Sequence, residues 1–123
     1  MNVLVACEES QAVCKAFRAR GHNAYSCDIL ECSGGHPEWH IKGDVIPLLN
    51  GFCRFQTMDG MGHAIDSRWD MIIAFPPCTF LTNTGNRWFD CVKYGYEAQK
   101  RWDNRCEAIC FFLAIAYADC DKI

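Results

Sequence analysis

A short apolar run followed by two prolines places the strongest constraint on the fold of this chain. The run extends from Met71 to Phe75. Its length and its flanking residues favour a buried strand of a parallel sheet over a helix. Pro76 and Pro77 end the strand, because proline has no N–H for a sheet and disfavours helix at the residue before it. The sequence therefore predicts a stiff turn that carries Cys78 past a strand end, where open α/β sheets bind ligands.

The first 28 residues predict a strand, a helix and a second strand. The first strand spans Val3 to Cys7 and is apolar throughout. After a turn, apolar residues recur at helical spacing, with Ser10 as the expected N-cap and Gly21 at the expected end. The second strand spans Ala24 to Asp28. This pattern predicts a βαβ unit with a tight first loop.

The rest of the chain predicts further elements of an α/β domain. Residues 29–40 have the composition of a loop. An Asp-Gly pair between the extended segments 52–57 and 62–66 predicts an inserted hairpin, which would shield a sheet edge. A helical pattern runs from Tyr96 to Tyr117, and Lys122 and Ile123 resemble the start of another strand.

Composition favours one compact domain in a reducing compartment. The chain has 123 residues, of which 50% are hydrophobic, and ten are cysteines. Ten cysteines suggest a disulfide scaffold, but Cys7, Cys27, Cys110 and Cys120 lie in or beside apolar patterns where cysteine acts as a small hydrophobe. The sequence begins as a strand without a secretion signal, so we expect a cytoplasmic protein. It has no apolar stretch of the roughly 18 residues that span a membrane.

Metal and nucleic-acid signals are weak. His36 and His40 are four residues apart with Pro37 between them, and no Cys-x-x-Cys pair exists, so we favour an ordinary loop and predict no metal site. The net charge of −3 gives no strongly basic footprint. A local basic cluster follows Cys78, and we favour the solvated face of a helix for it. Its members are Arg87, Lys93, Lys100, Arg101 and Arg105.

The residues Phe75, Pro76, Pro77 and Cys78 resemble the Pro-Cys motif of DNA cytosine-C5 methyltransferases. In that family the cysteine attacks C6 of a flipped-out cytosine, and S-adenosylmethionine supplies the methyl group. The resemblance implies that Cys78 is a nucleophile and that Pro76 and Pro77 contact the substrate. The same segment also resembles the Pro-Pro loop of amino-methyltransferases, which have no catalytic cysteine. After Cys78, the polar residues 79–87 would form a loop that closes over a base, and Trp88 and Phe89 would pack on the following helix or stack on nucleic acid.

The resemblance also implies a cofactor site. In the family, an acidic residue after the second strand binds the ribose of S-adenosylmethionine, and Asp28, followed by Ile29, holds that place. A Gly-Asp-Ile motif after the third strand binds adenine, and Gly43, Asp44 and Val45 match it except for the last residue. Without the family, Asp44 is a helix N-cap, and both roles are compatible.

The first loop departs from the family pattern. The family has Phe-x-Gly-x-Gly where this chain has no glycine between Val5 and Glu9, and close backbone approach is harder with side chains present. Glu8 and Glu9 are either solvated turn carboxylates or partners of the cofactor's amino group. The expected loop residues around the cofactor, together with Phe75, are Ala6, Cys7, Glu8, Glu9 and Ser10.

We therefore expect an α/β, Rossmann-like methyltransferase fold with a partial parallel sheet, flanking helices and the inserted hairpin. Residues 1–123 would form a single truncated domain, because the family's later Glu-Asn motif and its recognition domain have no counterpart. The expected function is that of a DNA (cytosine-C5) methyltransferase, inactive as this short chain, with DNA as partner. The alternative is a non-catalytic remnant that binds a protein or nucleic acid. An unpaired edge near the strand from Met71 to Phe75 would favour a homodimer.

Overall fold

The computed structural model describes residues 1–81 and 90–123, which form two compact units. The sheet unit comprises Met1–Phe75 and Tyr117–Ile123, and the helical unit comprises Pro76–Ala116. The predictions for a closing loop and for Trp88 and Phe89 fall mainly on residues 82–89, outside the described residues.

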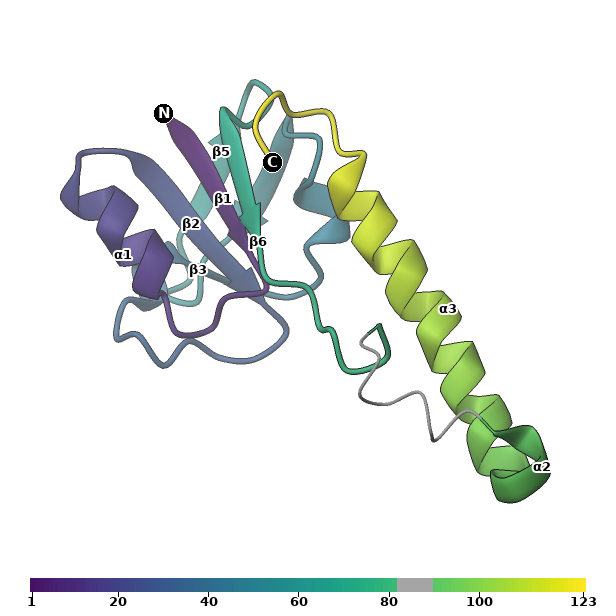
Figure 1. The fold of residues 1–123 in the computed structure, drawn as a ribbon. Coiled ribbons are helices and arrows are strands. Elements are labelled where there is room, and N and C mark those ends of the chain that lie inside the picture. The colour runs from purple at the N-terminus through teal and green to yellow at the C-terminus, as the bar shows by residue number, and fades with distance from the viewer. Residues whose placement is uncertain (82–89) are drawn as a thin grey trace. The chain divides into compact units, whose positions relative to one another are not determined.

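The sheet unit is built on a four-stranded parallel sheet with the order β3-β2-β1-β6 (Figure 1). The strands are β1 (Asn2–Ala6), β2 (Asn23–Asp28), β3 (His40–Lys42) and β6 (Met71–Ala74). This confirms the α/β class, the parallel sheet and the three strands whose positions the sequence predicted. The chain builds outward from β1 to β2 and β3, and β6 then pairs with the other side of β1. A topological switch point therefore lies between β1 and β6.

Helix α1 (Ala12–Ala19) covers one face of this sheet. Val3 and Val5 of β1, Ala24 of β2 and Cys14 of α1 form a fully buried cluster. On the opposite face of β1, Leu4 is also fully buried and pairs in register with Tyr25 of β2. Burial of both faces explains why the first strand is apolar throughout.

Gly21 ends α1 as predicted. Its φ of +85° is a left-handed conformation that glycine adopts without steric cost. The Gly21 N–H donates to the carbonyl of Arg18 at 2.9 Å, and the His22 N–H donates to the carbonyl of Phe17 at 3.1 Å. This pair of bonds is a Schellman motif, which satisfies the last carbonyls of the helix.

The predicted hairpin is also confirmed. Strands β4 (Cys53–Gln56) and β5 (Gly62–Ile65) pair antiparallel in a separate two-stranded sheet. The ring of Phe55 in β4 lies edge-on to the ring of Tyr25 in β2, with 4.9 Å between ring centroids. Beyond β4, the Met58 N–H donates to the carbonyl of His40 in β3 at 2.9 Å. The hairpin therefore packs on the sheet, and Met58, beyond β4, bonds to the outer strand β3. This agrees with the expectation that the hairpin shields a sheet edge.

The last residues of the chain return to β6, the strand at the other edge. The Ile72 N–H donates to the carbonyl of Lys122 at 2.8 Å, and Arg68 forms an ion pair with Asp119 at 2.8 Å. Lys122 and Ile123 do not form the strand that their resemblance to a strand start had led us to expect, yet this bond occupies part of the edge of β6 that was expected to be unpaired.

Two helices make up most of the helical unit that the structure describes. Asp90 caps α2 (Cys91–Tyr94) by accepting from the N–H groups of Val92 and Lys93. Helix α3 (Tyr96–Ala116) confirms the predicted long helix to within one residue. None of the helices in residues 1–81 and 90–123 has both the length and the apolar character needed to cross a membrane.

Candidate functional site

The carboxyl ends of β1 and β6 open onto a pocket of about 310 Å³ at the topological switch point. Five of its lining residues were predicted to surround a cofactor. The described residues that line it are Cys7, Glu8, Glu9, Ser10, Ala12, Val13 and Phe75. The predicted Ala6 is the last residue of β1 and is fully buried, and its carbonyl accepts from the Phe75 N–H at 3.0 Å. The structure thus brings the first loop and the end of β6 together.

Cys7 has the backbone conformation of a glycine. Its φ is +60°, in the left-handed region that is uncommon for residues with a side chain. Cys7 stands where the family resemblance expects the first glycine of the loop. The turn therefore has a glycine-like shape at this residue, although the sequence supplies a side chain. Gln11, at the other end of the turn, has a φ of +60° as well.

Glu8 caps the first turn of α1. Its carboxylate is buried, with the residue only 6% exposed. Oε1 accepts from the Val13 N–H at 2.6 Å, and Oε2 accepts from the Cys14 N–H at 3.2 Å. The prediction that Ser10 is the N-cap is wrong: the N-cap residue is Gln11, and it makes no side-chain cap bond. The longer Glu8 side chain reaches the free N–H groups from outside the helix, and its negative charge suits the positive end of the helix dipole.

This cap fills the place that an anionic ligand would use. In dinucleotide-binding sheets, the pyrophosphate sits on the N–H groups at the start of the first helix. Here the two N–H groups of Val13 and Cys14 already bind the Glu8 carboxylate. A phosphate brought to this point would also meet a buried negative charge. The pocket is therefore poorly suited to a dinucleotide.

Glu9 presents the second carboxylate of the loop. It is half-buried and lines the pocket. Its backbone carbonyl accepts from the Ser33 N–H at 2.9 Å, which fixes the position of the residue. Within residues 1–81 and 90–123, no hydrogen bond or ion pair engages its carboxylate. Glu9 is thus the carboxylate of this loop that a cationic ligand group would meet.

Asp28 and Asp44 lie around the same edge of the sheet. Asp28 ends β2, and its Oδ1 accepts from the Leu30 N–H at 2.9 Å. Asp44 is exposed, and its Oδ1 accepts from the Ile46 N–H at 3.0 Å. Burial, and then the charges of Asp28 and Asp44, raise the pKa of the Cys7 thiol to about 11. Both predicted cofactor carboxylates are therefore close enough to the first loop to act on Cys7.

Asp44 was expected to be a helix N-cap, and its bond to the Ile46 N–H is the one feature of such a cap that it shows. The element that follows is one turn of 3-10 helix, η2 (Ile46–Leu48), and its N-cap residue is Val45. Val45 is 3% exposed and belongs to the core. By contrast, Ile29, directly after Asp28, is 73% exposed.

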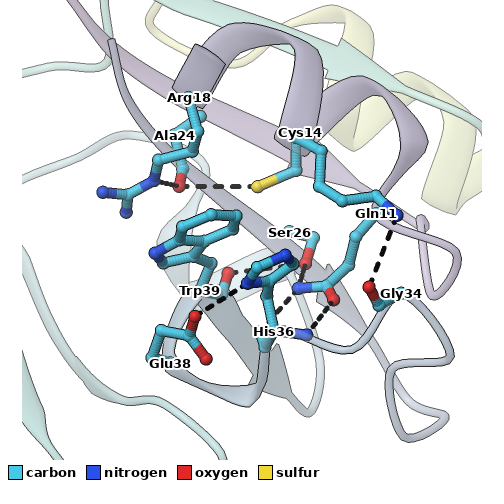
Figure 2. Close-up of polar contacts among 10 residues, drawn as sticks. Gln11, Cys14, Arg18, Ala24, Ser26, Gly34, His36, Glu38 and Trp39 are labelled. Carbon is cyan, nitrogen blue, oxygen red and sulfur yellow. Dashed lines mark hydrogen bonds and ion pairs between the residues drawn. The ribbon is translucent and has the colours of Figure 1, made fainter. Parts of the chain in front are cut away.

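A buried glutamine, which the sequence analysis did not single out, holds the loop after β2 against the start of α1 (Figure 2). The Gln11 side-chain amide donates to the carbonyl of His36 at 2.8 Å and to Ser26 Oγ at 3.2 Å, and its Oε1 accepts from the His36 N–H at 3.0 Å. Gly34 lies so close that an added Cβ would be 2.5 Å from the Ser10 carbonyl oxygen. No local pattern marks such a residue, because its partners are 15 and 25 residues away.

His36 and His40, which are four residues apart, both form contacts with other groups of the protein. His40 is fully buried, with Nδ1 at 2.8 Å from Ser26 Oγ and Nε2 at 2.9 Å from the Leu30 carbonyl oxygen. His36 pairs with Glu38 at 2.8 Å. Among the residues that the structure describes, no group of three side chains is arranged to hold a metal ion.

Cys78 belongs to the helical unit, three residues after Phe75. It is an exposed free thiol at the start of a turn in which the Leu81 N–H donates to the Cys78 carbonyl at 2.9 Å. Pro77 is exposed and Pro76 is half-buried. The predicted nucleophile is therefore accessible.

Comparison with models of protein families, with curated proteins and with solved structures gives no match for this chain.

Proposed function

We propose that this chain is part of an S-adenosylmethionine-dependent methyltransferase of the DNA cytosine-C5 type, with a Rossmann-like sheet and Cys78 as the nucleophile. The observation that carries the proposal is the Glu8 cap beside the switch-point pocket. S-adenosylmethionine has no phosphate, and it carries a positive sulfonium and a positive ammonium group. A Rossmann-like pocket whose phosphate position is filled by a carboxylate suits this cofactor better than a dinucleotide.

The residues around the pocket match the parts of the cofactor in chemistry. The Glu9 carboxylate would accept from the ammonium group, as the alternative for the first loop anticipated. Asp28 would bind the ribose hydroxyls, and Asp44 would bind the adenine amine. Ile29 and Phe75, which are 73% and 50% exposed, would cover apolar parts of the bound molecule.

The reaction would use the exposed Cys78 thiol. Its thiolate would add to C6 of a flipped cytosine, and S-adenosylmethionine, held by Glu9, Asp28 and Asp44, would supply the methyl group to C5 from its sulfonium. Loss of the C5 proton to a base then expels the thiolate and restores the ring. The Glu-Asn motif that would assist at N3 of the cytosine has no match in this sequence, so turnover by these 123 residues should be slow.

The first test is calorimetry of S-adenosylmethionine binding. We expect binding by the unaltered protein, loss of binding in Asp28→Ala, and no change in Asp66→Ala, an exposed carboxylate in the segment after the hairpin. Under the same conditions NAD should not bind. Absence of S-adenosylmethionine binding to the folded protein would contradict the proposed site. Equal affinity of the unaltered protein and Asp28→Ala would contradict it as well.

A second test separates covalent from non-covalent methylation. DNA that contains 5-fluorocytosine should form a stable adduct with the protein, because fluorine at C5 blocks release of the cysteine. Cys78→Ser should abolish this adduct, and Cys106→Ser, at another exposed cysteine, should not. Methylation of an amino group without an adduct would instead favour the amino-methyltransferase interpretation.

One observation favours the second candidate, a non-catalytic remnant that binds a protein or nucleic acid. Cys7 and Glu9, which line the pocket, stand at the two positions of the first loop where the family has glycines. At about 310 Å³, the pocket is at the lower end of the range for small-molecule sites. A folded protein that binds neither cofactor nor its demethylated product would support this candidate.

A further inference from the structure

The helical unit has a pocket of its own, with a volume of about 440 Å³. It is formed by the turn after Cys78, by α2 and by the first half of α3. The described residues that line it are Phe80, Tyr94, Glu97, Lys100, Arg101 and Asn104. The volume lies within the usual range for small-molecule sites.

Each of the two aromatic rings that line this pocket lies beside a cation. The Arg101 guanidinium lies 4.9 Å from the centre of the Phe80 ring, and the Lys93 ammonium lies 5.4 Å from the centre of the Tyr94 ring. Lys100 is exposed at the pocket. Among the described residues that line the pocket, Glu97 is the only one with a carboxylate. Aromatic faces beside positive charge are the combination by which proteins bind single-stranded nucleic acid.

One wall of the pocket is fixed by α3. The Arg105 Nε–H donates to the carbonyl of Phe80, while Arg101 covers the ring of the same residue. Phe80 also lies inside the turn closed by the bond from Leu81 to Cys78. The pocket wall and the exposed thiol thus belong to one anchored turn, two residues apart.

We infer that this pocket binds one nucleotide of single-stranded nucleic acid. The base stacks on Tyr94 or Phe80, the phosphodiester meets Lys100, and the Asn104 amide offers hydrogen bonds to a base edge. The inference that the pocket binds nucleic acid is argued from these contacts alone. The further step, that binding holds the strand beside the Cys78 nucleophile, rests on the proposed function.

The test is fluorescence anisotropy of a labelled twelve-nucleotide oligothymidylate over a range of salt concentrations, with no cofactor present. We expect Lys100→Ala to weaken binding about 5- to 10-fold at low salt and to reduce the salt slope by about 0.7, the value for one phosphate of a single strand. Tyr94→Ala should weaken binding by about 5-fold or more through lost stacking, and Tyr94→Phe should retain it. The control is Lys122→Ala, which removes the same charge from the sheet unit.

Circular dichroism of each variant checks that α3 stays folded, and a variant that unfolds is replaced by Asn104→Ala. No binding by the unaltered protein, equal loss in Lys100→Ala and Lys122→Ala, or tighter binding to a duplex of matched length would each overturn the inference. These outcomes are independent of the calorimetry. Binding of the oligonucleotide without binding of S-adenosylmethionine would support the nucleotide pocket and contradict the proposed function. Binding of S-adenosylmethionine without binding of the oligonucleotide would support the proposed function and contradict the nucleotide pocket.

Discussion

The carboxylate of Glu8 accepts a hydrogen bond of 2.6 Å from the backbone N–H of Val13, and so occupies the start of α1 from within the chain. The cap is local in sequence, and it places a carboxylate at the helix N-terminus beside the pocket. The same carboxylate therefore affects both the stability of α1 and ligand binding in the pocket. Unfolding and binding experiments measure these two effects separately.

Removal of the cap should destabilise the protein. We expect Glu8→Ala to lower the free energy of unfolding by about 1 to 3 kcal/mol, because the partly buried N–H of Val13 and the buried N–H of Cys14 lose a charged acceptor. Urea unfolding followed by circular dichroism measures the change. Glu9→Ala, at the next residue, should cost less than about 0.5 kcal/mol. Equal effects of the two variants would show that the Glu8 bonds contribute little.

Cys7 should tolerate glycine better than valine. Glycine adopts a φ of +60° without strain, whereas a β-branched residue in the left-handed region is strongly disfavoured. We expect Cys7→Gly to remain within about 1 kcal/mol of the unaltered protein and Cys7→Val to lose about 2 kcal/mol. Cys53→Val, in strand β4, supplies the matched change at an extended residue. The prediction fails if both Cys7 variants unfold at the same urea concentration.

Gly34 should be sensitive to the addition of one methyl group. A Cβ there would be 2.5 Å from the Ser10 carbonyl oxygen, so the loop after β2 would have to move away from the first turn. We expect Gly34→Ala to cost about 1 to 3 kcal/mol in thermal or urea unfolding. Gly62→Ala is the control, since an added Cβ there meets nothing within 4 Å. Equal melting temperatures for the two variants would contradict the close approach.

The buried thiols should make the protein less stable in alkaline solution. Burial raises the pKa of Cys27 from 9.0 to about 12, and burial also raises the pKa of Cys14 to about 11. The folded protein keeps these protons at pH 10, while the unfolded chain releases them, so the free energy of unfolding falls as the pH rises above about 9. Urea unfolding at several pH values from 7 to 10.5 measures this slope.

The cysteine controls for that slope come from the same chain. Cys27→Ala should make the dependence on pH shallower, whatever it does to stability at pH 7. Cys106→Ala, at an exposed thiol, should leave the slope unchanged. A slope that stays the same in Cys27→Ala would assign the alkaline effect to other groups.

The sequence was most informative where one local pattern determined one element. The apolar run before Pro76 predicted β6, Gly21 predicted the end of α1, and the Asp-Gly pair predicted the β4–β5 hairpin. Each depends on a backbone preference that acts over a few residues. The predicted pocket residues in the first loop also came together, because parallel strands end at the same edge of the sheet.

The sequence was least informative where contacts bridge distant segments. One wrong prediction was local: Ser10 has a residue type typical of an N-cap, but Glu8 caps the helix with its longer side chain from outside the helix. The burial of Gln11 depends on Ser26 and His36, which no local pattern connects to it. The anchoring of Phe80 by Arg105 spans 25 residues in the same way.

The bond between the Ile72 N–H and the Lys122 carbonyl has a consequence for the order of folding. Fifty residues of chain separate these two groups, and the ion pair of Arg68 with Asp119 closes a similar span. During synthesis, β6 can pair with β1 as soon as it emerges, but its outer edge stays open until α3 has been made. Because closing such a span costs entropy before it gains contacts, we expect this edge to be the last part of the sheet unit to be protected.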